Sequence, residues 1–180
     1  MTVRVTKPAF NLREKISELD YERVPYEKMP AGTVIQLLRH HRGSGQWVST
    51  SSAYQLVSNM NASISPKKAG SLIYVEYHIY ARVYETNSHR SRAHFEIRDN
   101  VAGDNFNTGR SKYIYHYYDY GGSGLLADAM QTLTYSFITH NTDTIEFGLY
   151  GRLEAGDAME VNPSNENTSD NSVTIYEIAQ

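Results

Sequence analysis

Cysteine is absent from the 180-residue sequence. This excludes disulfide bonds, thiolate metal sites and cysteine nucleophiles, so stability must come from packing or from assembly with other chains. Long hydrophobic runs are absent too. No stretch approaches the roughly 18 apolar residues that a membrane-spanning helix needs, and residues 1–30 contain no signal-peptide core. We therefore expect no membrane insertion, and synthesis in a cytoplasm.

A large excess of charge of either sign is also absent, because the formal net charge is only −3. Nucleic-acid-binding proteins normally present a broad basic surface, so nucleic acid is not an expected partner. The 7 histidines show no H-E-x-x-H spacing, and the glycine clusters at 43–45 and 121–124 match neither a P-loop nor a G-x-S-x-G motif. The sequence therefore predicts no catalytic residues, no metal site, no cofactor and no enzymatic activity.

Tyrosine is abundant, with 15 residues, and together with the dispersed Val, Ile and Thr residues it favours strands over helices. In "SLIYVEYHIYARVY", residues 71–84, apolar side chains from Ile73 onward alternate with Tyr, Glu, His and Arg side chains from Tyr74 onward. One face of this strand is predicted to be core and the other aromatic and charged. Its length predicts a bend or bulge within it.

Similar strand patterns recur along the chain, separated by loops rich in Gly, Asn, Asp and Ser. They lie at 33–39, 46–50, 55–64, 91–98, 111–118, 126–140 (as two pieces), 144–152, 157–161 and 172–179. Roughly ten strands in one chain predict an all-β fold, an antiparallel two-sheet β-sandwich that is jelly-roll-like and occupies residues 31–180.

The N-terminal segment has a different pattern. Asn11 as N-cap and Glu14 three residues later predict a short helix over about 11–20, with Leu12, Ile16 and Leu19 on one stripe and Phe10 just before it. A helix this short needs a packing partner in water. The prolines and glycine in 24–32 end the helix and form a linker. We interpret residues 1–30 as an attachment segment whose apolar stripe is the anchor.

The stretch "KYIYHYYDYGG", residues 112–122, is the most unusual in composition. Its tyrosines Tyr113, Tyr115, Tyr117, Tyr118 and Tyr120 offer large rings with a polar tip, as do Tyr74, Tyr80 and Tyr84 on the 71–84 strand, and together the rings are predicted to cover one outer sheet. Three interpretations stay open: the subunit interface of a homotrimer, ordinary strand packing, or a platform for a glycan or receptor in which Trp47 takes part.

Several segments together resemble a known family. The run "VTKPAFNLREKISELDYERVPYEKMPAGTVIQ" at 5–36 resembles the N-terminal segment of small virion proteins of marine bacteriophages. The segments "NASISPKKAGSLIYVEYHIY" at 61–80, "DTIEFGLYGRLEAGDAMEVN" at 143–162 and "SVTIYEIAQ" at 172–180 are similar to later strands of that family. The Tyr-rich stretch at 113–120, "HHRGSGQW" at 40–47 and the loop at 99–110 depart from its pattern.

The resemblance implies a trimeric fibre, knob or decoration protein of the virion, with a β-sandwich domain and no catalytic residues. It also implies that the N-terminal segment attaches the trimer to other phage virion proteins of the capsid, portal or tail. Loops at 40–47, 85–90, 99–110 and 162–171 would then face the medium or the host. The alternative from another class is a lectin-like receptor-binding module, in which the Tyr-rich strand and Trp47 contact a host surface glycan.

Overall fold

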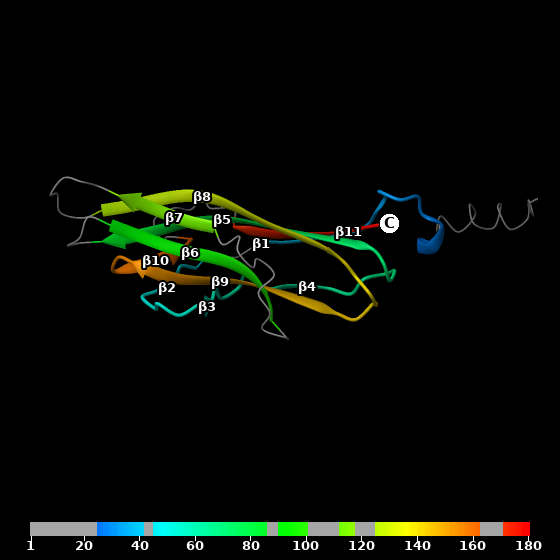
Figure 1. The fold of residues 1–180 in the computed structure, drawn as a ribbon, viewed down its shortest axis with the longest axis horizontal. Helices are drawn as coiled ribbons and strands as arrows, with labels where there is room; N and C mark the ends of the chain where they lie inside the picture. The colour runs from blue at the N-terminus through cyan, green and yellow to red at the C-terminus, as the bar shows by residue number, and fades with distance from the viewer. Residues whose placement is uncertain (1–24, 42–44, 86–89, 101–111, 118–124, 163–170) are drawn as a thin grey trace, which may run out of the picture.

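The computed structural model describes residues 25–41, 45–85, 90–100, 112–117, 125–162 and 171–180 (Figure 1). The predicted N-terminal helix lies outside these residues. Within them the helical structure is a single 3-10 turn, η1 (Tyr26–Lys28), and no helix is long and apolar enough to cross a membrane. The strands are β1 (Val34–His41), β2 (Trp47–Ser49), β3 (Gln55–Leu56), β4 (Ala62–Ile64), β5 (Leu72–Glu85), β6 (Arg90–Asp99), β7 (Lys112–Tyr117), β8 (Leu125–Ile138), β9 (Ile145–Ala155), β10 (Ala158–Val161) and β11 (Ser172–Ile178).

The strands form two antiparallel sheets, which run along the length of the molecule (Figure 1). In the six-stranded sheet the order is β1-β11-β5-β10-β2, and β8 pairs with the other edge of β5. In the five-stranded sheet the order is β3-β9-β6-β7, and β4 also pairs with β9. The fold is therefore the jelly-roll-like, all-β sandwich that the alternation predicted.

Strand β5 organises the six-stranded sheet. Its odd-numbered residues from Ile73 to Glu85 are buried, and its even-numbered residues are partly or fully exposed. The predicted bulge in β5 is wrong, because β5 pairs without interruption with β8 from Leu72 opposite Ile138 to Glu85 opposite Leu125. The predicted division of 126–140 is wrong for the same reason. Hydrogen bonding along this edge is continuous, and the register shifts occur instead in the β1–β11 and β6–β9 pairings.

The other edge of β5 is shared by two strands, since β11 pairs with residues 72–78 and β10 with residues 81–84. Tyr80 lies at the gap between them. There the Asn171 side-chain oxygen accepts a hydrogen bond from the Tyr80 backbone N–H, and the Asn162 backbone N–H donates to the Tyr80 carbonyl over 3.0 Å. These contacts satisfy the backbone groups that neither strand reaches.

The core lies between the sheets. Each fully buried aliphatic or aromatic side chain contributes about 1.5–3 kcal/mol of transfer free energy. Gly151 leaves room for two rings, because a Cβ atom there would lie 2.9 Å from the Phe95 ring and 3.3 Å from Trp47. The largest fully buried side chains are Tyr77, Phe95, Phe147, Met60, Ile64, Ile73, Ile79, Ile97, Leu133, Leu149, Met159 and Ile175.

The segment 55–64 is not the single strand that its pattern predicted. It forms β3 and β4, and the turn between them buries Val57 and Met60 completely. Asn59 in this turn has a φ of 62°, which asparagine tolerates better than most residues. Alternation fails here because the two buried side chains reach the core from a turn.

The C-terminal strand carries a fully buried carboxylate, Glu177. It accepts hydrogen bonds from the backbone N–H groups of Lys67 and Lys68, at 2.9 and 3.0 Å, and from Nε2 of Gln36 at 2.9 Å. Buried carboxylates are tolerated when several donors satisfy them. Through these hydrogen bonds, Glu177 connects the loop before β5 with strands β1 and β11.

Candidate functional site

The outer face of the six-stranded sheet carries aligned rows of side chains. At one end, strand register places Val34, Ile178, Leu72 and Ile138 in one row across β1, β11, β5 and β8. The next row consists of Leu37, Tyr176, Tyr74 and Ser136. We call the apolar members of these two rows the apolar patch: Val34, Leu37, Leu72, Tyr74, Ile138, Tyr176 and Ile178.

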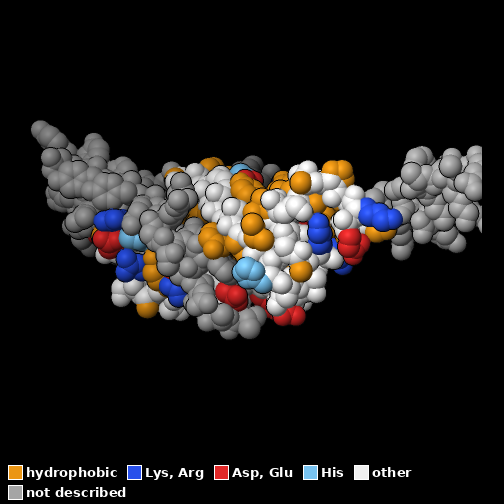
Figure 2. All heavy atoms as spheres, turned by 45° about the vertical axis from the view of Figure 1, so that its right-hand side comes forward, with side chains coloured by type: hydrophobic (Ala, Val, Ile, Leu, Met, Phe, Trp, Pro, Cys, Tyr) orange, Lys and Arg blue, Asp and Glu red, His pale blue; other side chains and the backbone are white. Residues whose placement is uncertain are grey.

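The apolar patch is open to solvent. Leu37 is 55% exposed, Ile138 53% and Val34 50%. The rings of Tyr74 and Tyr176 pack against each other with centroids 5.9 Å apart. Figure 2 shows hydrophobic side chains gathered in the middle of one face of the molecule, with charged side chains mostly toward its ends and lower edge. Contiguous exposed apolar surface of this kind marks interaction sites in soluble proteins.

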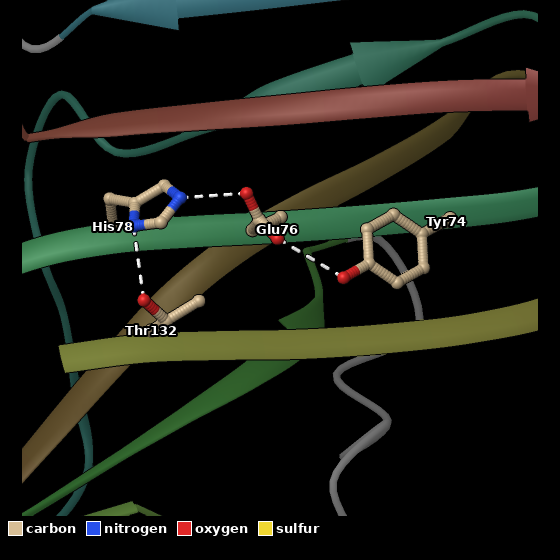
Figure 3. A network of polar contacts seen from close by, with 4 residues as sticks. All are labelled: Tyr74, Glu76, His78 and Thr132. Atoms are coloured by element: carbon tan, nitrogen blue, oxygen red, sulfur yellow. Dashed lines mark hydrogen bonds and ion pairs between the residues drawn. The ribbon is translucent and has the colours of Figure 1, made fainter.

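A polar network borders the apolar patch on β5 and β8 (Figure 3). Tyr74 donates its hydroxyl hydrogen to Glu76 over 3.1 Å, and Nε2 of His78 donates to the same carboxylate over 2.7 Å. Nδ1 of His78 lies 3.0 Å from the Thr132 hydroxyl. Burial, together with the Glu76 carboxylate, raises the pKa of Tyr74. The network fixes the orientation of the Tyr74 ring at the rim of the patch.

The other end of the same face is less uniformly apolar. Tyr80 points outward there beside Met130, which is 60% exposed. Val48 and Tyr84 are also exposed, and Arg82 lies 3.9 Å from Glu160. Tyr74 and Tyr80 thus share the outer face of one sheet, as the alternation predicted.

The Tyr-rich strand does not belong to the sheet that contains β5. Strand β7 pairs with β6, so Tyr113, Tyr115 and Tyr117 belong to the five-stranded sheet. The prediction that these tyrosines and those of β5 cover one outer sheet is wrong, because periodicity orders side chains along a strand but does not assign strands to sheets. The side chains of β7 lie outside the described part of the structure, as do Tyr118 and Tyr120 and the anchor residues Phe10, Leu12, Ile16 and Leu19.

Trp47 does not have the exposed position that the glycan-platform interpretation requires. It is only partly exposed and packs against the hydrophobic core. Its partner in β10 is Val161, a fully buried residue on the inner face. Trp47 is therefore a packing residue.

The outer face of the five-stranded sheet holds a charged cluster that the alternation revealed only in part. The side chains of β6 that alternate with its buried apolar residues belong to Arg92, His94, Glu96 and Arg98, but His94 is only 4% exposed and Glu96 only 1%. Arg98 pairs with Glu96, and the carboxylate of Glu154 on β9 contacts both Arg92, at 3.0 Å, and His94. Strand pattern alone does not reveal burial on an outer face.

The pKa values of His94 and Glu154 in this charged cluster are shifted from their ordinary values. Burial lowers the pKa of His94, and the contact with Glu154 offsets this only in part. Burial acts to raise the pKa of Glu154, but its contacts with His94 and Arg92, together with the nearby positive charge of Arg152, outweigh burial and hold that pKa below its ordinary value. A neutral histidine beside an ionised carboxylate is the state that this geometry favours near pH 7.

Other candidate sites are weak. Across the described ranges, no group of three or more His, Asp or Glu side chains is arranged to hold a metal ion. A polar hollow of about 200 Å³ is lined by Asn61, Ala62, Ser63 and Glu146. It is smaller than the roughly 300–1,000 Å³ of typical small-molecule sites.

No protein-family model matches the sequence, and no curated protein matches it. Among solved structures, the chain is similar to Eiger TNF from S. frugiperda, with 9% identity and a TM-score of 0.43, over 82% of this chain and 95% of that one. It is similar to the VP2 subviral particle of infectious bursal disease virus, with 14% identity and a TM-score of 0.41, over 79% of this chain and 32% of that one. It is also similar to the C-terminal domain of EclA, a sugar-binding protein, with 10% identity and a TM-score of 0.38, over 74% of this chain and 78% of that one. Similarities this low assign the chain neither a family nor a function.

Proposed function

We propose that this protein is a structural component of a bacteriophage virion, a homotrimer that associates through the outer face of its six-stranded sheet. The observation that carries the assembly is the apolar patch, which leaves Val34, Leu37 and Ile138 half-exposed in two aligned rows. The resemblance of residues 5–36, 61–80, 143–162 and 172–180 to phage virion proteins supports the virion role and the threefold symmetry. The proposed role involves no catalysis.

The size of the face suits a second copy of the chain. Outward residues repeat about every 6.8 Å along a strand and strands lie about 4.8 Å apart, so the two rows of the apolar patch cover only about 260 Å². All seven outward residues of β5, from Leu72 to Tyr84, extend the four-strand face to about 900 Å². A standard interface buries about 800 Å² per partner. The proposed interface therefore runs the full length of the face, including Tyr80 and Met130.

The composition of the face matches an assembly interface. Tyr and Met are enriched in the centre of such interfaces, and polar groups lie at their rim. Tyr74 and Tyr176 form an aromatic pair in the apolar patch, and Glu76 and His78 border it. Cyclic assembly on this face buries the exposed Leu37 and Ile138 side chains and turns the opposite sheet outward.

The variant Leu37→Asp tests the interface. A carboxylate in the apolar patch must be desolvated on association, so sedimentation velocity should show a shift from trimer to monomer. Leu56→Asp is the matched control, because Leu56 is an exposed leucine of the opposite sheet, and it should remain trimeric. Equal behaviour of the two variants would contradict the placement of the interface.

Attachment to the particle is assigned to the N-terminal segment. Replacing Leu12 and Ile16 with Asp should leave a folded trimer that is missing from purified particles. Particles that keep a full complement of the double variant would refute the anchoring role. Hydrolysis of a host polysaccharide by the purified protein would refute the non-catalytic role.

A further inference from the structure

The charged cluster on the outer face of the five-stranded sheet has more positive than negative formal charges. Three guanidinium groups, from Arg92, Arg98 and Arg152, lie there with two carboxylates, Glu96 and Glu154. His94 is held neutral by burial, which lowers its pKa. Among the described residues of this cluster, one positive charge therefore has no carboxylate paired with it, although the net charge of the chain is −3.

The two carboxylates are engaged by other groups. Glu154 accepts from Nη1 of Arg92 over 3.0 Å and contacts Nε2 of His94. Glu96 accepts from Arg98. Arg152 acts on Glu154 and His94 only through the longer-range field that displaces their pKa values.

The guanidinium group of Arg152 contacts an aromatic ring, that of Tyr54. Its Cζ lies 5.1 Å from the centre of the Tyr54 ring, while Cζ of Arg98 lies 4.5 Å from the same ring and 5.0 Å from Tyr150. Within the described part of the chain no carboxylate forms an ion pair with Arg152, and its buried Nε has no hydrogen-bond partner. A buried donor without a partner is destabilising, and more so when it is charged.

We propose that Arg152, beside Tyr54, is a binding site for an anionic oxygen group, a carboxylate or a sulfate, borne by an external ligand. A guanidinium presents several N–H donors in a planar fork that matches such groups, and partial burial strengthens the interaction relative to open solvent. Arg152 is partly exposed and is therefore reachable. The site lies on the sheet opposite the proposed subunit interface, so it does not depend on the trimer.

Two sources can supply this group: an acidic polysaccharide or a free inorganic anion. The test uses isothermal titration calorimetry of the full-length protein at fixed ionic strength with dextran sulfate, polygalacturonate and sodium sulfate, and with neutral dextran as the blank. We expect at least one anionic probe to bind and neutral dextran not to bind. Binding of a polysaccharide but not of sodium sulfate identifies a glycan-borne group, and binding of sodium sulfate alone identifies a small-anion site.

The assignment to Arg152 is tested by two variants of equal charge. Arg152→Gln should weaken binding at least tenfold, whereas Lys67→Gln should change it less than twofold. Lys67 is a suitable control because its side chain is exposed in the loop before β5, away from the charged cluster, and its replacement removes the same charge. Arg152→Lys keeps the charge but loses the planar fork of N–H donors, so its affinity should lie between those of Arg152→Gln and the wild type. This second variant keeps the test valid if Arg152→Gln does not fold.

Two results would overturn the proposal. One is the absence of binding to every anionic probe by the wild-type protein. The other is an equal loss of affinity in Arg152→Gln and Lys67→Gln, which would indicate attraction by overall charge alone. Neither result bears on the trimer, whose mass is measured separately.

Discussion

Tyr77 presents a hydroxyl group to the core that has no hydrogen-bond partner among the described residues. Its side chain is fully buried, and burial raises the pKa of this phenol. An unpaired buried hydroxyl costs about 1–3 kcal/mol, whereas the ring itself contributes to packing. Tyr77→Phe removes only the hydroxyl, so we expect the free energy of unfolding to rise by about 1–2 kcal/mol. For a chain of this size the melting temperature should rise by roughly 2–8 °C.

The assay for Tyr77→Phe is urea unfolding at one fixed protein concentration, because the stability of an oligomer depends on concentration. The control is Tyr74→Phe, which removes a hydroxyl that donates to Glu76 over 3.1 Å and should lower the unfolding free energy by about 1 kcal/mol or less. A Tyr77→Phe variant less stable than the wild type would refute the reasoning, because it would mean that the hydroxyl has a partner.

Three further variants test the core and the charged cluster. Glu177→Gln weakens the acceptor of the Lys67 and Lys68 backbone N–H groups, so urea unfolding should show a loss of about 1–3 kcal/mol. Gly151→Ala places a Cβ atom 2.9 Å from the Phe95 ring, and overpacking should cost about 1–3 kcal/mol in the same assay. Because the folded-state pKa of His94 is lowered, the unfolded chain binds its proton first, so stability should be lost as pH falls below 6.5. Thermal unfolding of His94→Gln should show a smaller loss of stability as pH falls below 6.5.

The layout of the fold was predictable where alternation was strict. The 71–84 pattern placed Ile73 inward and Tyr74 outward, and both assignments are confirmed. Alternation contains no information on which strands pair, so it could not predict that β7 joins the five-stranded sheet. The bulge in β5 was wrongly predicted because the uninterrupted pairing with β8 involves residues about 50 positions away, which the local pattern does not contain.

The candidate sites were predictable only in part. Tyr74 and Tyr80 were identified from their rings, but Leu37 and Ile138 were not, because one exposed aliphatic residue on a strand is unremarkable until register aligns it with others. Arg152 was not identified as a site residue from the sequence. Its missing partner depends on how Arg92 and Arg98 engage the carboxylates, and no local pattern specifies that.

The central claim is that the chain forms a homotrimer, and the most direct test is the solution mass of the full-length protein by light scattering over a dilution series. One chain has a mass of 20.4 kDa, so the account predicts about 61 kDa, stable to dilution. A mass of 20.4 kDa at every concentration, or of two chains only, would contradict it.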